Sequence, residues 1–380
     1  MTPAHTHPTT PSLLLDIDRF AANHARLATH LRALGVPLRP HVKTAKCLPL
    51  IRRAIEGQPG GVTVSTLREA AACLDGGIRD ILYAVGIAPQ KLADVAVLQA
   101  RGAQLTIILD SIAAAQAVAA HRAATGRGVP TLIEIDSDGH RAGVAPESAL
   151  LLEIAAILGE DLRGVMTHAG ESYHCVSAES KRAMAAQERD AAVHAALRLR
   201  VAGFAAPVVS VGSTPTAQFA DDLAGVTEVR AGVYMFHDLV MAGLGVCAVD
   251  DIAISVLVTV IGHQAAKGWL ITDGGWMAVS RDRGTAAQAV DQGYGVVCDA
   301  DGCVLGDLVM SGANQEHGII ARRDGGTWDL SAFPVGTRLR ILPNHACATA
   351  AQFGGYVLLA GGQLTGEYWA RFNGFSSRGD

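Results

Sequence analysis

Lysine is scarce in this sequence, so each lysine that is present warrants a question about its role. Only five of the 31 basic residues are lysines, namely Lys43, Lys46, Lys91, Lys181 and Lys267. Arginine supplies the remaining positive charge, but only lysine offers an amine that can lose its charge when buried and attack a carbonyl. Two of the five lie in residues 38–46, directly after an early apolar segment. The alternative is that both are ordinary solvated loop lysines.

Other absences limit the classes of protein to which the chain can belong. The net charge of −5 comes without a basic cluster, so the sequence predicts no nucleic-acid partner. No apolar run reaches about 18 residues, so no membrane partner is expected. The seven cysteines are scattered and form no C-x-x-C pair, which indicates buried thiols in a reducing cytoplasm. Residues 1–11 lack the basic start and apolar segment of a signal peptide, which predicts a short disordered lead.

The chain is rich in apolar residues, which make up 49% of its 380 positions. This is enough for a large buried core, and the length favours one large domain with a smaller one. Short β-rich segments alternate with Ala- and Leu-rich helical segments over the first 230 residues or so. The predicted strands cover residues 37–41, 61–65, 80–85, 104–110, 130–136, 162–168, 207–212 and 227–231. The predicted helices cover residues 19–34, 46–56, 67–75, 89–101, 111–124, 147–158 and 179–202.

Eight strands in alternation with helices predict an α/β fold, a (β/α)8 TIM-type barrel, with a doubly wound open sheet as the alternative. The pattern changes after residue 245, where β-branched segments are separated by Gly and Asp. Such segments, at 246–262, 269–273, 293–298, 306–311 and 337–342, predict an antiparallel β domain. We therefore expect a barrel domain over residues 12–244 and a β-rich domain over residues 245–380.

Polar residues follow most of the predicted barrel strands, and barrel enzymes place their chemistry at those strand ends. They include residues 41–43, 136–141, 167–173, 212–216 and 230–234. The GSTPT sequence at 212–216 offers small residues, hydroxyls and backbone amides where barrels often bind phosphate. A lysine at the same rim suggests either a Schiff base to pyridoxal phosphate or a class I aldolase that forms an imine directly with its substrate. The residues alone leave both open.

A second candidate site is the H-x-C sequence formed by His345 and Cys347. We expect this segment to be extended, which would place the imidazole and the thiolate on one side of the backbone. Two such ligands are too few for a structural zinc site but fit a catalytic site that keeps open positions. The alternative is a buried thiol beside a hydrogen-bonded histidine.

Six motifs together resemble one known family. They are RPHVKT at 39–44, EIDSDGHRAGV at 134–144, THAGESY at 167–173, GSTPT at 212–216, RAGVY at 230–234 and PNHAC at 343–347. In this order, over nearly the whole chain, they resemble the metal-dependent D-serine dehydratase and D-threonine aldolase family. That family belongs to the alanine racemase-like, fold-type III enzymes that use pyridoxal 5′-phosphate.

The resemblance implies a homodimer with pyridoxal 5′-phosphate and a divalent metal (Zn, Mn, Co or Mg) as cofactors. Lys43 would be the catalytic residue and would carry pyridoxal phosphate, and His345 and Cys347 would hold the metal. The other implied cofactor-binding residues are Arg141, Tyr173, Thr214, Gly232, Val233 and Tyr234. The substrate would be a small D-amino acid with a β-hydroxyl group.

The implied reaction is a β-elimination by a dehydratase, a carbon–nitrogen ammonia-lyase. D-threo-3-hydroxyaspartate would give oxaloacetate and ammonia, and D-serine would give pyruvate and ammonia. Members with aldolase activity have H-x-D at the metal motif, whereas this chain has His345 and Cys347, as in the dehydratases. Related eukaryotic dehydratases have a tyrosine where this chain has Met166, so that contact is not carried over.

Four other functions remain open at this stage. A D-threonine-type aldolase would break the bond between the α and β carbons, and an amino-acid racemase would need no metal. The chain could also bind pyridoxal phosphate without catalysis, or be a metal-dependent hydrolase that lacks this cofactor. The roles of several further residues stay unassigned, namely His140, His168, His237, His263, His317 and Arg281.

Overall fold

The structure of the chain is a computed structural model and describes residues 8–375. By its internal contacts the chain divides into two units. Of the described residues, the barrel unit comprises Ala25–Gly232 and residues 372–375, and the β unit comprises residues 8–24 and Val233–Arg371. Most of the lead expected at residues 1–11 lies outside the described residues.

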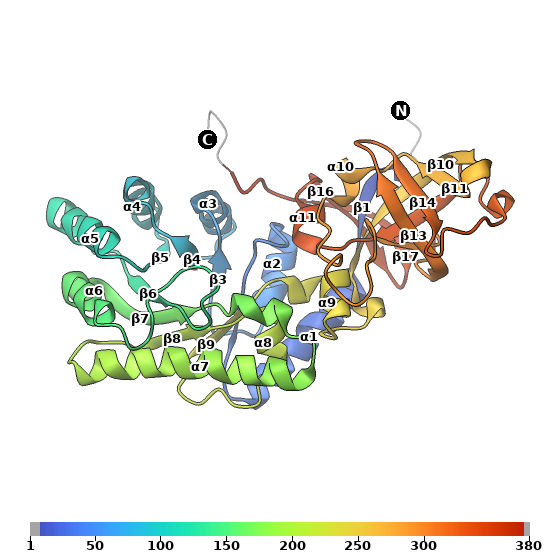
Figure 1. Ribbon diagram of the computed structural model, residues 1–380. Coiled ribbons are helices and arrows are strands. Elements are labelled where there is room, and N and C mark those ends of the chain that lie inside the picture. The colour runs from blue at the N-terminus through green and yellow to red at the C-terminus, as the bar shows by residue number, and fades with distance from the viewer. Residues whose placement is uncertain (1–7, 376–380) are drawn as a thin grey trace. The chain divides into compact units, whose positions relative to one another are not determined.

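The barrel unit contains eight parallel strands that are nearly closed into a barrel (Figure 1). They are β2 (Leu38–Pro40), β3 (Val62–Val64), β4 (Asp80–Gly86), β5 (Gln104–Leu109), β6 (Thr131–Ile135), β7 (Leu162–Thr167), β8 (Val208–Val211) and β9 (Glu228–Ala231). Their spatial order is β2-β9-β8-β7-β6-β5-β4-β3. The gap between β2 and β3 is bridged by a parallel pairing of His41 with Thr63. The barrel prediction is therefore confirmed, and the open doubly wound sheet is wrong.

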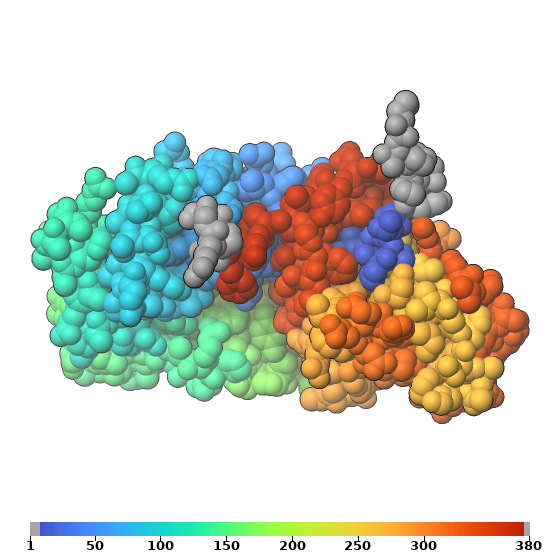
Figure 2. All heavy atoms as spheres, turned by 90° about the horizontal axis from the view of Figure 1, so that it is seen from above, coloured from blue at the N-terminus to red at the C-terminus, as the bar shows by residue number. Residues whose placement is uncertain are grey.

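Helices follow most of these strands. They are α2 (Leu48–Ile55), α3 (Leu67–Asp75), α4 (Leu92–Ala100), α5 (Ile112–Thr125), α6 (Leu150–Leu158), α7 (Ala178–Val201) and α8 (Thr214–Phe219), and a further helix, α1 (Ile17–Ala33), precedes the first of these strands. Four begin at a Ser or Thr whose side-chain oxygen accepts a backbone N–H of the first turn, namely Thr66, Ser111, Ser177 and Ser213. Such caps satisfy amides that a helix start leaves without partners. On the face shown in Figure 2, the segment from α3 to α5 forms the outer surface of the barrel unit.

One cluster of apolar side chains joins four neighbouring barrel strands. It contains Leu82 on β4, Ile108 on β5, Leu132 on β6 and Met166 on β7, all nearly inaccessible to solvent. Met166 thus fills a place in the apolar core. Burial of side chains of this size stabilises a fold by about 1.5–3 kcal/mol each.

The β unit is a nine-stranded sheet. Its strands are β1 (Ser12–Asp16), β10 (Ile254–Gln264), β11 (Trp269–Thr272), β12 (Val296–Cys298), β13 (Val304–Ala313), β14 (Gly318–Arg322), β15 (Arg338–Leu342), β16 (Gly355–Ala360) and β17 (Gln363–Ala370). The order is β11-β14-β13-β12-β15-β10-β1-β16-β17, with a further pairing of β11 and β10 that closes part of the sheet into a ring. Only β1 and β16 pair in parallel. The predicted antiparallel β domain is confirmed with that exception. Its helices are α9 (Leu239–Gly243), α10 (Trp276–Val279) and α11 (Ala346–Ala350).

The structure places the N-terminal strand β1 in the β unit, whereas we expected residues 12–244 to form the barrel domain. The three consecutive leucines of β1 are buried, and β1 pairs with β10 on one side and β16 on the other. A strand that is buried on both faces reads as an apolar run, and nothing in that run identifies the sheet it joins. Among the described residues, no helix is both long and apolar enough to cross a membrane.

Candidate active site

The two lysines of the first candidate stretch have different surroundings in the barrel unit. Lys43 lies in the turn after β2, is exposed, and makes no ion pair within residues 8–375. The Lys46 ammonium pairs with the buried Glu69 carboxylate at 3.0 Å and lies 5.5 Å from the ring centroid of Phe375. The amine of Lys46 is therefore engaged in structure, whereas that of Lys43 is available for chemistry.

Two histidines near Lys43 are held in the neutral form. Burial lowers the pKa of His41 well below its usual value, and the positive charges of Lys43 and Arg230 lower it further. Burial also lowers the pKa of His168 to about 3, although a hydrogen bond to the Gly212 carbonyl opposes the shift. The Nδ1–H of His168 donates that bond at 3.0 Å. Neutral imidazoles at this rim leave Lys43, Arg141 and Arg230 as the positive charges that act on them.

Gly232 lies directly against the Lys43 segment. A Cβ atom at position 232 would come within 3.0 Å of the His41 carbonyl oxygen and 3.3 Å of the Thr44 hydroxyl. The backbone N–H of His41 also donates to the Ala231 carbonyl at 2.7 Å. The structure thus brings together Lys43 and Gly232, two of the predicted site residues, at the ends of adjacent strands.

Tyr173 and Arg141 lie on the loops after β7 and β6. The ring of Tyr173 is 6.2 Å from that of His168, centroid to centroid. The Arg141 side chain is 63% exposed and lies 3.7 Å from the buried Glu134 carboxylate. Its charge also acts on His168, so both predicted residues gather around that histidine.

The loop at 212–216 is built differently from the expectation. We expected free backbone amides, but the amides of Gly212, Ser213 and Thr216 all donate hydrogen bonds within the protein. The acceptor for Gly212 is the carboxylate of Glu188, and the other two amides bond reciprocally with the side chains of Ser213 and Thr216. Among the side chains of this loop, the hydroxyl of Thr214 is buried and has no hydrogen-bond partner within the described residues.

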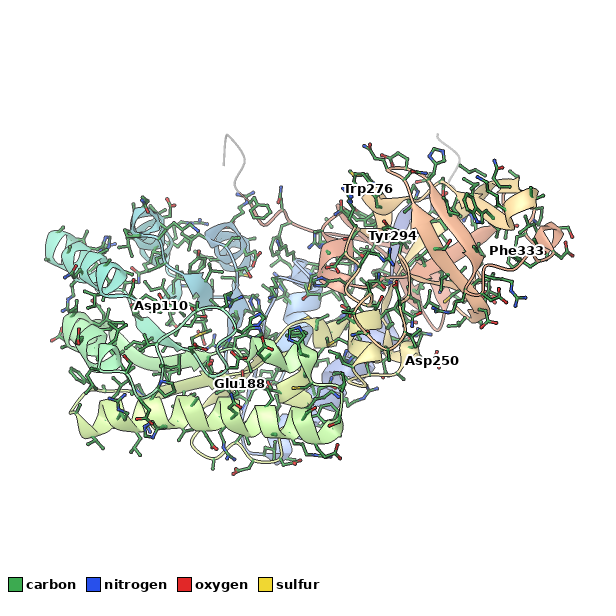
Figure 3. The ribbon with its side chains drawn as sticks, viewed as in Figure 1. Asp110, Glu188, Asp250, Trp276, Tyr294 and Phe333 are labelled. Atoms are coloured by element: carbon green, nitrogen blue, oxygen red, sulfur yellow. The ribbon has the colours of Figure 1, made fainter. Side chains whose placement is uncertain are left out.

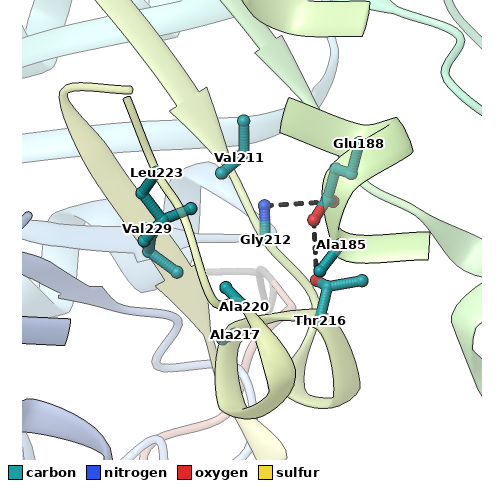
Figure 4. Close-up of a pocket in the computed structure, with 9 residues that line it drawn as sticks. All are labelled: Ala185, Glu188, Val211, Gly212, Thr216, Ala217, Ala220, Leu223 and Val229. Carbon is teal, nitrogen blue, oxygen red and sulfur yellow. Dashed lines mark hydrogen bonds between the residues drawn. The ribbon is translucent and has the colours of Figure 1, made fainter. Parts of the chain in front are cut away.

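The carboxylate of Glu188, on α7, holds this loop in place through hydrogen bonds. Its Oε1 atom accepts the backbone N–H groups of Ala169 at 2.8 Å and Gly212 at 3.1 Å, and its Oε2 atom accepts the hydroxyl of Thr216 at 2.6 Å. Figure 3 labels Glu188 on α7, and Figure 4 draws its bonds to Gly212 and Thr216. A small cavity beside it is lined by Ala185, Val211, Ala217, Ala220, Leu223 and Val229. Burial raises the pKa of Glu188, and these hydrogen bonds oppose the rise.

Val233 and Tyr234 fall in the β unit, directly after Gly232. Tyr234 is fully buried, and its hydroxyl lies 3.2 Å from Nδ1 of His24 on α1. Burial raises the pKa of Tyr234. The phenol is therefore neutral and held in place by α1.

His345 and Cys347 do not lie on a strand. The backbone is extended at His345 but becomes helical at Ala346, so the expectation of an extended segment through Cys347 is wrong. His345 is the N-cap of α11, and Cys347 lies in the first turn of that helix. Burial lowers the pKa of His345, but hydrogen bonds with Asp282 and Cys347 raise it to about 11. The helical turn thus still brings the imidazole and the thiol into contact.

The donor set at this pair fits a divalent metal with open coordination positions. Imidazole nitrogen and thiolate sulfur are ligands of zinc and other borderline ions. Within residues 8–375 no three His, Cys, Asp or Glu side chains are grouped to hold a metal ion. His345 and Cys347 would therefore be the protein's two ligands, and the remaining positions would be open to substrate and water.

Three residues that matter at these sites were not anticipated from the sequence. Glu188 sits in the middle of a helix and looks like a surface acid, and Asp282 lies in a loop. Arg230 ends a predicted strand within the RAGVY motif, but its burial was not expected. Its side chain is 3% exposed, and its guanidinium bonds to Ser210 at 2.8 Å and to the Thr167 carbonyl. The one signal that marks Arg230 is the burial of its charge, and that burial can be seen only in the structure.

Two protein families match this chain. Residues 15–239 match the family described as "Alanine racemase, N-terminal domain", and residues 253–359 match the "Putative serine dehydratase domain". These matches define a protein of the alanine racemase-like, fold-type III class, whose cofactor is pyridoxal phosphate. The orphaned hydroxyl of Thr214 and the available amine of Lys43 fit that cofactor. The chain belongs to the metal-dependent D-serine dehydratase and D-threonine aldolase family.

Individual relatives agree with this assignment. The chain is 54% identical to D-threo-3-hydroxyaspartate dehydratase from Delftia sp., over 96% of this chain and 98% of the relative. The solved structure of that enzyme superposes with a TM-score of 0.95, covering 97% and 98% of the two chains. D-serine dehydratase from Dictyostelium discoideum is 28% identical over 91% of this chain and 92% of its own. D-threonine aldolase from Filomicrobium marinum has a TM-score of 0.80 at 26% identity, with 95% of each chain covered.

Proposed function

We propose that this protein is a pyridoxal phosphate- and divalent metal-dependent dehydratase of β-hydroxy D-amino acids. D-threo-3-hydroxyaspartate is the preferred substrate and gives oxaloacetate and ammonia, and D-serine gives pyruvate and ammonia. The observation that carries the proposal is the 54% identity with the Delftia dehydratase over 96% of this chain. The H-x-C sequence at His345 and Cys347 supports a dehydratase over an aldolase.

In this proposal the residues of the barrel unit hold the cofactor and move the first proton. Lys43 would hold pyridoxal phosphate, and its Nζ atom, as a free amine, would take the proton from the α-carbon of the substrate. The Thr214 hydroxyl would donate to the phosphate group, which would give a partner to a buried side-chain oxygen that has none within the described residues. Gly232, Val233, Tyr234, Tyr173 and Arg141 would complete the cofactor contacts, and the close approach at Gly232 leaves little room for a side chain.

His345 and Cys347 hold the divalent ion. When bound, pyridoxal phosphate accepts the electron pair left at the α-carbon, and the ion withdraws charge from the departing hydroxide, which is a poor leaving group at neutral pH. In the Delftia enzyme, structures have been solved with a histidine and, two positions later, a cysteine replaced by alanine, the latter in a metal-free form. This supports the same role for the H-x-C pair here.

The test is to identify the products formed from D-threo-3-hydroxyaspartate and from D-threonine. With D-threo-3-hydroxyaspartate we expect oxaloacetate and ammonia, and with D-threonine 2-oxobutanoate and ammonia. Glycine with glyoxylate or acetaldehyde would instead establish an aldolase. Exhaustive chelation should abolish the reaction and added Mn²⁺ or Zn²⁺ should restore it, whereas conversion to the L-isomer without metal would establish a racemase.

We also propose that the enzyme is a homodimer of the reducing cytoplasm. No disulfide joins any of the seven cysteines, all of which lie within the described residues. Light scattering of the purified protein tests the dimer, because a monomer at micromolar concentration would contradict it.

A further inference from the structure

The imidazole of His345 is held by a carboxylate that no motif predicted. The Nδ1–H of His345 donates to Oδ2 of Asp282 at 2.6 Å. A histidine that binds a metal through one ring nitrogen usually donates the other N–H to a carboxylate or carbonyl, which fixes the tautomer and the ring orientation. With Nδ1 occupied, the nitrogen left for an ion is Nε2.

Asp282 is itself fixed in position by its neighbours. Its Oδ1 atom accepts the backbone N–H of Gly284 at 2.8 Å, and its backbone N–H donates to the Ser280 hydroxyl at 3.1 Å. Its carbonyl accepts the side-chain amide of Asn344 at 3.1 Å, which ties it to the residue before His345. The carboxylate therefore does not have to be ordered when an ion binds.

The residues on either side of Asp282 are also anchored. The guanidinium carbon of Arg281 lies 5.1 Å from the ring centroid of Trp276, and that of Arg283 lies 5.0 Å from that of Tyr294. Both rings are labelled in Figure 3. Cation–π contacts of this kind are attractive and hold the two side chains that flank Asp282.

Asp238 is a second carboxylate near the pair, but it does a different task. Its two oxygens accept the backbone N–H groups of Met241 at 2.9 Å and Ala346 at 2.9 Å. These bonds cap α9 and hold the backbone between His345 and Cys347. Asp238 thus shapes the turn, and of these two carboxylates it is Asp282 that accepts a hydrogen bond from the imidazole ring.

We propose that Asp282 is the positioning residue of the metal site: it keeps the proton of His345 on Nδ1 and so presents Nε2, beside the Cys347 sulfur, to the ion. This inference rests on the proposed function, because it assumes that His345 is a metal ligand. It adds a residue that touches neither substrate nor ion and acts through the histidine.

The most informative variant is Asp282→Asn. Two N–H donors face the two oxygens of Asp282, one from Gly284 and one from His345. An asparagine offers one oxygen and one NH2 group, so when its oxygen serves Gly284 its NH2 group faces Nδ1 and shifts the ring proton to Nε2. The shape is nearly unchanged, so the variant should fold, and Asp282→Ala removes the carboxylate entirely.

The experiment is a Co²⁺ titration of the metal-free protein with pyridoxal phosphate bound, followed by thiolate-to-cobalt absorbance. We expect both Asp282 variants to bind Co²⁺ about 10–100-fold more weakly than the wild type. Thermal unfolding of the metal-free Asn variant should remain a single cooperative transition, with a midpoint lowered by the loss of the charged pair between Asp282 and His345. The control is Asp324→Asn in the same unit, which breaks an exposed pair with Arg322 and should leave the affinity unchanged.

The variants His345→Ala and Cys347→Ser distinguish a failure of the inference about Asp282 from a failure of the proposed function. If they lose Co²⁺ binding while Asp282→Asn binds within about threefold of the wild type, Asp282 has no positioning role and the metal site stands. If both bind Co²⁺ like the wild type, the ion is held elsewhere and the proposed function fails with the inference.

Discussion

The barrel unit and the β unit place their reactive groups by different means. In the barrel unit, Lys43, Arg141, Tyr173 and Thr214 each follow a parallel strand, so strand order alone brings them to one rim. In the β unit, His345 and Cys347 are neighbours in sequence, but the ring of His345 is oriented by Asp282, which lies 63 residues earlier. A repeated architecture thus places groups through topology, whereas an irregular sheet does so through individual hydrogen bonds.

The largest expected effect tests whether the barrel rim supplies the essential amine. Lys43→Ala should reduce turnover by at least about 10³-fold, because it removes both the cofactor anchor and the proton acceptor. Steady-state ammonia release with D-threo-3-hydroxyaspartate measures this. Lys267→Ala, at an exposed position in the β unit, is the matched control and should retain full turnover. Full activity of Lys43→Ala would remove the barrel unit from the reaction.

The next prediction concerns Glu188, the residue of the barrel unit that most resembles Asp282. Glu188→Ala leaves the buried amides of Ala169 and Gly212 without an acceptor and should lower the free energy of unfolding by about 2–5 kcal/mol. Glu188→Gln keeps one oxygen for both amides and can donate its NH2 group to Thr216, so it should cost less. Urea denaturation compares the two. Equal losses would mean that the negative charge, and not the acceptor for these amides, is what the loop requires.

A smaller effect is expected at Thr214. Its buried hydroxyl has no partner within the protein, so Thr214→Val should leave the unfolding free energy of the cofactor-free enzyme nearly unchanged. The same change should weaken pyridoxal phosphate binding about tenfold or more, since a hydrogen bond to a charged group contributes about 1.5–3 kcal/mol. Cofactor titration by absorbance provides the measurement. If stability falls and cofactor affinity does not, the hydroxyl serves the fold.

The smallest effect is a pH dependence of stability from His168. Its pKa is about 3 in the folded chain, against about 6.5 when unfolded, so the unfolded chain binds the extra proton as the pH falls below 6.5. The contribution of neutral His168 to the free energy of unfolding is complete above pH 6.5. It falls by about 1.4 kcal/mol per pH unit between pH 6.5 and pH 3. His168→Asn can keep the hydrogen bond to Gly212 and cannot titrate. Urea midpoints at pH 7.5 and 5.5 should therefore differ less in this variant than in the wild type.

The sequence predicted the barrel well because its signal is local. Each barrel strand is an apolar run that ends in polar residues, and each helix between strands has its own periodicity. The polar strand ends then predicted where Lys43 and Gly232 would lie, and the structure brings them together.

The remaining features depend on partners far away in the sequence. The H-x-C segment looked extended because it follows β15, but Asp238 accepts the Ala346 amide and α11 begins there instead. No local sequence pattern marks Glu188 or Asp282. A carboxylate in a helix or loop is expected to lie at the surface until its hydrogen-bond donors are known. Arg230 was read as part of a motif, and only the coordinates reveal that its charge is buried.

The place of β1 in the β unit also bears on synthesis of the chain. Among the described elements this strand is synthesised first, yet β10 and β16, which flank it, begin only at Ile254 and Gly355. Its three leucines lack β10 until residue 254 has been made and lack β16 until residue 355 has been made. A nascent polypeptide that stalls before residue 254 has an apolar strand without either neighbour, and one that stalls before residue 355 still lacks β16. Such an unpaired apolar strand is the kind of surface that chaperones bind and that aggregates when they are absent.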